Sequence, residues 1–72
     1  MGVLMMSIGE RVWALRAAKG WSQRYLAAMA GVGPPCIMRL EDGRTKYPMA
    51  ESLQAIANAL EVTVEELMQG EE

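Results

Sequence analysis

The positively charged side chains of this 72-residue chain all lie in its first two thirds. Seven Arg and Lys residues fall between residues 7 and 48, against three acidic residues, whereas residues 49–72 contain six glutamates and no cation. The net charge of −2 therefore combines a basic part at +4 with an acidic part at −6. The Arg and Lys side chains of the basic part can bind phosphate groups while the acidic part faces away from them. An acidic tail that only aids solubility, beside an ordinary surface, would give the same pattern.

Side chains suited to catalysis or metal binding are scarce. The chain has no histidine, so the commonest general base is absent and a Cys/His zinc site is excluded. Ser7, Ser22 and Ser52 fit helix caps or helix surfaces, and the single cysteine, Cys36, cannot form an internal disulfide. The sequence has no glycine-rich phosphate loop. We therefore expect no enzyme activity and no metal or cofactor.

Membrane and secretion signals are also missing from the sequence. No apolar run approaches the ~20 residues that a membrane span needs. The opening residues 1–6 are apolar but too short for a secretion signal, and they lack a basic flank. We expect a cytoplasmic protein with no membrane contact.

The basic part contains a helix-turn-helix pattern at about residues 22–42. Ser22 can cap a helix that Gly31 ends. A second helix begins at Pro34 and Pro35, because the N–H that proline lacks would have no partner in a first turn anyway. Two short helices joined by a tight, glycine-containing turn are typical of a motif whose second helix enters the major groove of DNA.

Three further helices are predicted around this pair. Ser7 opens a first helix through a capping box with Glu10, and Thr63 opens a short last helix in the same way. Between the helix-turn-helix and Thr63, another helix is expected at about residues 49–60. No stretch alternates apolar and polar residues for long enough to indicate a strand. The sequence therefore predicts an all-α fold.

A single domain is expected, because 72 residues leave no room for a second. We place the folded domain at residues 7–69, with an apolar extension at residues 1–6 and an acidic tail at residues 70–72. The core of so short a chain is small, so dimerisation would add stability.

Four segments, taken in order, resemble the Cro/CI (XRE-type) repressor family of phage and bacteria. They read IGERVxxLRxxKGWSQxxLA, AGV, IxRLEDGRTKYP and LxxIAxALxVTVEEL, and they cover about residues 8–68. The resemblance implies a compact, five-helix, lambda-repressor-like domain that binds double-stranded operator DNA, usually as a homodimer. It also implies a nucleoid-associated regulator of transcription, either a repressor or a controller.

The family assigns roles to matching positions. Gln23 matches a glutamine that binds phosphate at the start of the second helix. Arg16 and Glu41 match a structural salt bridge between the first and third helices, which also holds Arg16 near the DNA backbone. Together with the loop after the third helix, the implied phosphate-contacting residues are Arg16, Ser22, Gln23, Arg24, Arg44, Thr45 and Lys46. The alternative is that the cations in this set are merely solvated, as most exposed cations are.

The positions expected to face the bases depart from the family pattern. They are Gly33, Pro34, Pro35, Cys36, Met38 and Arg39. Related proteins usually have polar residues at the start of this helix, whereas proline cannot hydrogen-bond to a base edge and can only pack on a thymine methyl group. Arg39 is suited to a bidentate guanine contact, or it is an ordinary solvated arginine. We expect few direct base contacts, with specificity that is low or depends partly on DNA shape.

Apolar residues also occupy helix positions that the family leaves polar. Trp13, Tyr25 and Met29 lie off the predicted core faces, and Tyr25 and Met29 are four residues apart, close enough to touch. Such residues are either scattered surface hydrophobes or an interface with a partner protein. The alternative function is therefore a protein-interaction module on a helix-turn-helix scaffold, with weak or lost base-specific DNA binding.

Overall fold

The computed structural model describes residues 6–69, which form five α-helices and no strand. The helices are α1 (Ile8–Ala18), α2 (Gln23–Ala30), α3 (Pro34–Glu41), α4 (Ala50–Leu60) and α5 (Val64–Met68). The predicted all-α fold of five helices is confirmed. The proposed acidic tail, and the proposed apolar extension except for Met6, lie outside the described residues.

Local signals set where the helices begin. The hydroxyls of Ser7, Ser22 and Thr63 each accept a hydrogen bond from a backbone N–H in the first turn of the helix that follows. Both predicted capping boxes are present, because the carboxylates of Glu10 and Glu66 accept the backbone N–H of Ser7 and Thr63, respectively. These contacts satisfy N–H groups that have no partner within the helix itself.

Two helices end at a residue in the left-handed conformation. Gly31 follows α2 with a φ of 73°, and Glu61 follows α4 with a φ of 63°. Glycine adopts this conformation without steric cost, whereas a residue with a Cβ does so at a cost of roughly 1–2 kcal/mol. The sharp turn at Gly31 allows residues 31–33 alone to join α2 to α3.

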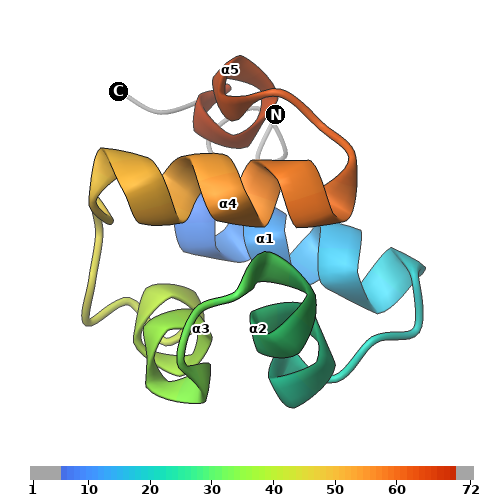
Figure 1. Ribbon diagram of the computed structural model, residues 1–72. Coiled ribbons are helices and arrows are strands. Elements are labelled where there is room, and N and C mark those ends of the chain that lie inside the picture. Colours follow the sequence, from blue (N-terminus) through green and yellow to red (C-terminus); the bar gives the residue numbers. More distant parts are fainter. Residues whose placement is uncertain (1–5, 70–72) are drawn as a thin grey trace.

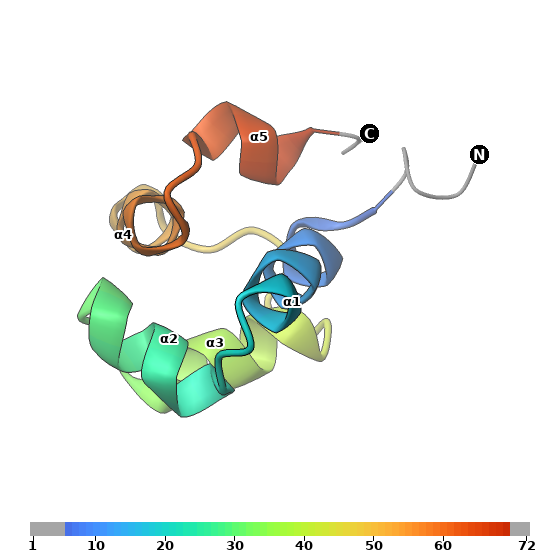
Figure 2. The ribbon, with the colours of Figure 1, turned by 90° about the vertical axis from the view of Figure 1, so that its right-hand side faces the viewer.

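The helices are arranged so that the helix-turn-helix forms one end of the molecule. In Figure 1, α2 and α3 lie side by side below α4, while α5 lies above it. Figure 2, turned by 90°, again places α2 and α3 at the end opposite α5. α2 packs against both α3 and α4, and α1 packs against α3 and α5. The α2–α3 pair is thus supported from one side and open to solvent on the other.

The core is built from one side of every helix. Burying a valine, leucine or isoleucine side chain contributes about 1.5–3 kcal/mol to the stability of the fold. The buried apolar residues are Ile8, Val12, Leu26, Ala27, Ile37, Leu40, Leu53, Ile56, Ala57, Leu60 and Leu67. Among them, Ile37 and Leu40 attach α3 to the core, which leaves the opposite side of that helix exposed.

Gly9 marks a close approach between α1 and α3. A Cβ at this position would overlap the carbonyl oxygen of Leu40 and would lie 2.9 Å from the carbonyl carbon of the same residue. Both groups belong to the backbone, so neither can move aside as a flexible side chain would. The position therefore requires glycine, and the resulting contact fixes α3 against α1.

Candidate nucleic-acid interface

The first turn of α3 points into solvent. Gly33 is the N-cap of the helix and makes no side-chain capping bond, and Pro34 and Pro35 occupy its first two positions. Gly33 and both prolines are exposed, whereas Ile37 and Leu40 on the other side are almost fully buried. The start of the helix is thus accessible, as a DNA-contacting helix requires.

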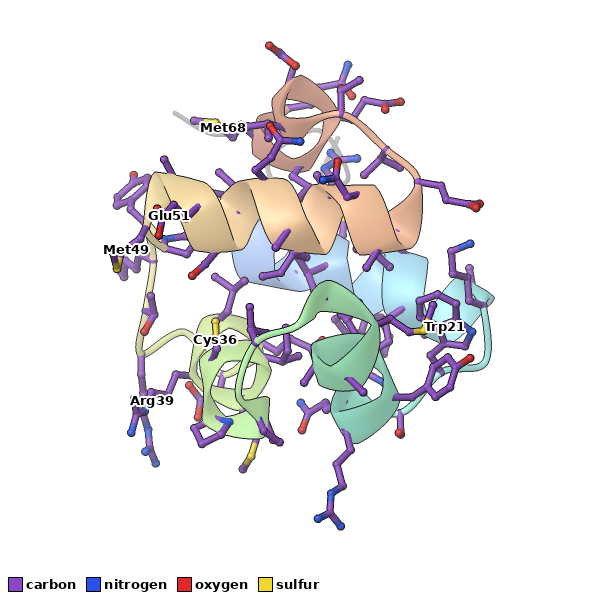
Figure 3. All side chains as sticks on the ribbon, in the orientation of Figure 1. Trp21, Cys36, Arg39, Met49, Glu51 and Met68 are labelled. Atoms are coloured by element: carbon purple, nitrogen blue, oxygen red, sulfur yellow. The ribbon has the colours of Figure 1, made fainter. Side chains whose placement is uncertain are left out.

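Three of the residues expected to face bases share one exposed side of α3. Pro35, Met38 and Arg39 are spaced three and four residues apart, so they lie on the same side of the helix. All three are exposed, Met38 by 50%. In Figure 3 the Arg39 side chain extends away from the body of the protein. Cys36 differs, because it is half-buried, packs against the core and lies toward α4 (Figure 3).

A largely buried network joins the end of α1, the start of α2 and the end of α3. Nε and Nη2 of Arg16 donate to the two carboxylate oxygens of Glu41, each at 2.8 Å, so the expected ion pair is bidentate. Nη1 of Arg16 donates to the backbone carbonyl of Trp21 at 2.7 Å. The side-chain amide of Gln23 donates to Glu41 at 2.9 Å. The side chains of Arg16 and Glu41 are 13% and 5% exposed.

The network stabilises the charged form of Arg16. Its pKa lies above the ordinary arginine value, mainly because the guanidinium donates hydrogen bonds to the Glu41 carboxylate and also because of the charge of that group, while burial acts in the opposite direction. Such charge-assisted bidentate contacts are stronger than neutral hydrogen bonds. Arg16 and Gln23 are thus engaged inside the protein, where they position α3, and the phosphate contacts expected of them stay predictions.

The loop after α3 places two cations at the surface. Arg44 pairs with Asp42 at 3.4 Å but remains 77% exposed, and Lys46 is exposed as well. The backbone N–H of Arg44 donates to Asp42, and that of Thr45 donates to the carbonyl of Arg39. Thr45 itself is half-buried. The loop therefore offers the side chains of Arg44 and Lys46 to a ligand, while these two N–H groups are used within the protein.

The start of α2 combines a helix cap with an aromatic pair. The Ser22 hydroxyl accepts the backbone N–H of Tyr25 at 3.0 Å, and Arg24 beside it is exposed. The rings of Trp21 and Tyr25 pack edge to face with centroids 4.9 Å apart. Nζ of Lys19 lies 5.1 Å from the Trp21 centroid, within cation–π range. Sequence reasoning did not foresee this cluster, although the spacing of its two aromatic residues was a possible signal.

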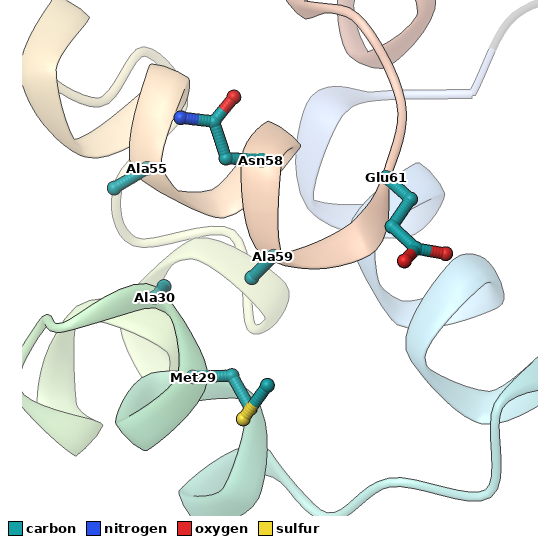
Figure 4. Close-up of a pocket in the computed structure, with 6 residues that line it drawn as sticks. All are labelled: Met29, Ala30, Ala55, Asn58, Ala59 and Glu61. Carbon is teal, nitrogen blue, oxygen red and sulfur yellow. The ribbon is translucent and has the colours of Figure 1, made fainter.

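The apolar residues considered for a partner protein do not gather around one hollow. Trp13, Tyr25 and Met29 are each about half exposed. Tyr25 lines a hollow at the connection between α1 and α2, next to Trp21. Met29 lines a different, open hollow of about 390 Å³ between α2 and α4, where it lies near Ala59 (Figure 4). The structure therefore does not single out a common docking surface for these three side chains.

The chemistry available on this surface is that of binding. Exposed guanidinium and ammonium groups can neutralise phosphates, and the apolar side chains of α3 can pack against bases. Between residues 6 and 69, no helix combines the length and apolar character needed to cross a membrane. Within the same range, no group of three or more Cys, Asp and Glu side chains is placed to hold a metal ion.

Five helices with an exposed helix-turn-helix at one end define a DNA-binding domain of the lambda-repressor type. A family model described as helix-turn-helix matches residues 14–67. Since the match spans most of the chain, the protein belongs to the XRE-type (Cro/CI) helix-turn-helix family, and the resemblance drawn from the sequence is confirmed. Proteins of this family are DNA-binding regulators of transcription, which agrees with the prediction that the chain is not an enzyme.

Two curated regulators are similar to nearly the whole chain. The HTH-type transcriptional activator BcrR of Enterococcus faecalis is 37% identical over 67 residues, which are 93% of this chain and 32% of BcrR. The HTH-type transcriptional repressor RghR of Bacillus subtilis is 34% identical over 64 residues, which are 89% of this chain and 47% of RghR. The chain thus spans between a third and a half of the length of these relatives.

A solved DNA-binding domain shares the fold. The N-terminal DNA-binding domain of SinR from Bacillus subtilis matches with a TM-score of 0.83 and 31% identity, over 86% of this chain and 90% of that domain. A crystal structure of SinR in complex with DNA matches with a TM-score of 0.82, over 86% of this chain and 98% of that one. The lambda-repressor-like arrangement of the five described helices is therefore confirmed.

Proposed function

We propose that the protein regulates transcription by binding operator DNA sequence-specifically as a homodimer, with α3 in the major groove. The observation that supports this best is the exposed side of α3. Pro35, Met38 and Arg39 lie together there, at the end of the molecule that α2 and α3 form (Figure 1). An α-helix fits the width of the major groove, and an arginine on its exposed side can contact the edge of a guanine.

Exposed cations supply the phosphate contacts in this proposal. Arg24 lies in the first turn of α2, and Arg44 and Lys46 lie in the loop that follows α3. α3 lies between α2 and this loop (Figure 1), so cations on both could contact the two backbones that border the major groove. Arg16 and Gln23 support binding by orienting α3 through Glu41. Ser22 supports binding by capping α2, and Thr45 by holding the loop in place through the hydrogen bond from its backbone N–H to the carbonyl of Arg39.

A homodimer would bind two half-sites about one helical turn, ~34 Å, apart. The relatives include one protein named an activator and one named a repressor. We propose repression here, because a dimer that occupies promoter DNA prevents polymerase from binding the same DNA. The two-fold symmetry of the dimer should appear as a palindrome in the selected sites.

The proposal is tested by selecting bound duplexes from a random pool and titrating salt. A DNA-binding protein should enrich a defined palindromic motif, and the logarithm of its affinity should fall steeply with the logarithm of salt concentration. Binding no stronger than background on every duplex would reject the proposal. That result would favour the alternative, a protein-interaction module on a helix-turn-helix scaffold.

Two alanine variants separate base contacts from phosphate contacts. Arg39→Ala should relax the preference at one base position, since a bidentate guanine contact contributes about 1–3 kcal/mol of discrimination. Lys46→Ala should weaken binding to all sequences alike and reduce the salt slope by about one. Affinities for the selected site and for single-base variants of it measure both effects. Equal losses on every duplex for both variants would contradict this division of roles.

A further inference from the structure

The open hollow between α2 and α4 lies on a part of the surface that the proposed DNA interface does not use. It has a volume of about 390 Å³ and is lined by Met29, Ala30, Ala55, Asn58, Ala59 and Glu61. These residues belong to α2, or to α4 and its C-cap, and none belongs to α3. In Figure 4, Ala59 lies on the side of α4 that faces α2, above Met29. A ligand in this hollow therefore does not have to cover the exposed side of α3.

The walls of the hollow are mostly apolar and partly exposed. Met29 is 53% exposed, and Ala30, Ala55 and Ala59 are half-buried. Ala55 and Ala59 are four residues apart, so they lie on the same side of α4. Small side chains let another helix approach closely, and the flexible thioether of methionine adapts to the shape of a partner. Because the hollow is open along the groove between two helices, it suits a segment of chain better than a small molecule that must be enclosed.

The charge at one end of the hollow is negative. Glu61 is the C-cap of α4, and its side chain is 82% exposed. Neither α2 nor α4 has a basic residue in its last turn, and residues 49–72 contain no cation. The C-terminal end of a helix carries a partial negative charge, which adds to the charge of Glu61. This end of the hollow therefore favours a positively charged group.

Lys19, the C-cap of α1, neutralises Glu61 only in part. Its Nζ lies 3.5 Å from Oε1 of Glu61 and 5.1 Å from the centroid of the Trp21 ring, so the ammonium is shared between two partners. Exposed ion pairs of this kind are weak. A carboxylate has about four lone-pair positions, so Glu61 can accept a second cation without losing the first.

We propose that the hollow between α2 and α4 binds a basic amphipathic helix of a partner protein. An apolar side chain of that helix enters between Met29 and Ala59, and a lysine or arginine about one turn away pairs with Glu61. The wall of α4 rises about 9 Å from Ala55 to Glu61, which accommodates partner side chains four residues apart, a rise of about 6 Å. Helices that dock in grooves use apolar anchors at this spacing. The inference goes beyond the proposed function, because it does not require the protein to bind DNA.

The test uses the full 72-residue protein without DNA and a fluorescent probe peptide of about four helical turns. The probe has leucine on one side of the helix and lysine on the other. A second peptide has glutamate in place of each lysine, and a third has the lysine peptide's composition in an order that forms no apolar side. Fluorescence anisotropy at 0.15 M salt measures the affinities. We expect the lysine peptide to bind at least about tenfold more tightly than either of the others, because like charges repel and a scrambled peptide lacks the anchors.

Two pairs of protein variants locate the binding site. Met29→Gln removes an apolar wall and should weaken binding of the lysine peptide about fivefold, whereas Met68→Gln makes the same change on α5 and should have an effect below about 1.5-fold. Glu61→Gln should weaken binding about threefold, and Glu65→Gln, also on α5, by less than about 1.5-fold. All four side chains are exposed, and far-UV circular dichroism checks that the variants keep their helices.

Amide chemical shifts measured by NMR provide an independent map of the site. The largest changes on adding the lysine peptide are expected at Met29, Ala59 and Glu61. Largest changes elsewhere, or equal losses in the two members of either variant pair, would show that binding is not specific to the hollow and would overturn the inference. Equal affinity for the lysine and glutamate peptides, or no binding of the lysine peptide, would overturn it as well. Because DNA is absent throughout, these outcomes are independent of the test of the proposed function.

Discussion

At the scale of single residues, the position of α3 depends on the pair of Arg16 and Glu41. Arg16 lies in the last turn of α1, and Glu41 is the final residue of α3. Their two parallel hydrogen bonds, together with the contact from Gln23, connect three helices. A lysine ammonium cannot reproduce the planar, two-pronged contact of a guanidinium with a carboxylate. The pair therefore depends on arginine specifically, and not only on a positive charge.

We expect Arg16→Lys to lower the free energy of unfolding by about 1–3 kcal/mol, because hydrogen bonds to a largely buried charged group are lost. Arg44→Lys is the matched control. The pair of Arg44 and Asp42 is 77% and 46% exposed, and exposed pairs contribute at most about 1 kcal/mol. Urea unfolding followed by circular dichroism measures both variants. Equally small losses in the two variants would show that the buried pair adds no stability.

The pH dependence of this effect follows from the raised pKa of Arg16. A group whose pKa is higher in the folded state stabilises the protein fully below its unfolded pKa, and the effect is lost as pH rises through the folded value. The pKa of arginine lies far above neutral pH even in the unfolded chain, so the charge of Arg16 is constant between about pH 6 and 9. Wild type and Arg16→Lys should differ by the same free energy across that range. A gap that narrows toward pH 9 would contradict this assignment.

At the scale of helices, the contact at Gly9 sets how closely α1 and α3 pack. We expect Gly9→Ala to destabilise the protein by about 1–3 kcal/mol or more, because the added carbon would overlap the backbone of Leu40. Gly33→Ala makes the same chemical change where the new carbon would lie 3.6 Å from Pro35 Cδ, an ordinary contact. That variant should change stability by less than about 1 kcal/mol. Thermal unfolding of the two variants and of wild type measures this difference in stability. Similar unfolding midpoints for Gly9→Ala and Gly33→Ala would refute the steric argument.

The helices themselves were predictable because their signals are local. Ser7, Ser22 and Thr63 cap helices through residues three positions away, and Gly31 ends α2 through its own backbone conformation. Each signal lies within one turn of the helix end that it sets, so it can be read directly from the sequence.

Contacts between distant residues were less accessible to sequence reasoning. Arg16 and Glu41 are 25 positions apart, and only the family resemblance indicated that they pair. The close approach at Gly9, the half-buried position of Cys36 and the internal use of the Thr45 N–H depend on how α1, α3 and α4 pack. Residue type and spacing alone do not predict these contacts, because each contact forms only once the helices have packed together.

At the scale of the whole molecule, the charge division of the sequence is seen in space at the two ends of the molecule, although Lys19 of the basic part pairs with Glu61 of the acidic part at 3.5 Å. Arg24 and Arg39 belong to the helix-turn-helix, whereas Glu65 and Glu66 belong to α5 at the opposite end (Figure 1). α1 and α4 lie between them, a separation of at least one helix diameter, or roughly 10 Å. That exceeds the Debye length of about 8 Å at physiological salt. The acidic end should therefore have little effect on phosphate binding.

Glu65→Gln tests this separation. The substitution removes an exposed charge from α5 without touching the capping box of Thr63 and Glu66. We expect it to change DNA affinity by less than about twofold at 0.15 M salt, because screening removes most of the interaction. Lys46→Ala under the same conditions should weaken binding clearly. A larger change for Glu65→Gln would place α5 nearer the bound DNA than this arrangement implies.

The two sides of α3 have separate tasks, and this has an evolutionary consequence. Ile37, Leu40 and Glu41 attach the helix to the rest of the protein, while Pro35 and Met38 are exposed. Mutations on the solvent side can therefore accumulate with little penalty in folding. Descendants of one ancestral gene can in this way acquire different genomic targets while their architecture stays the same.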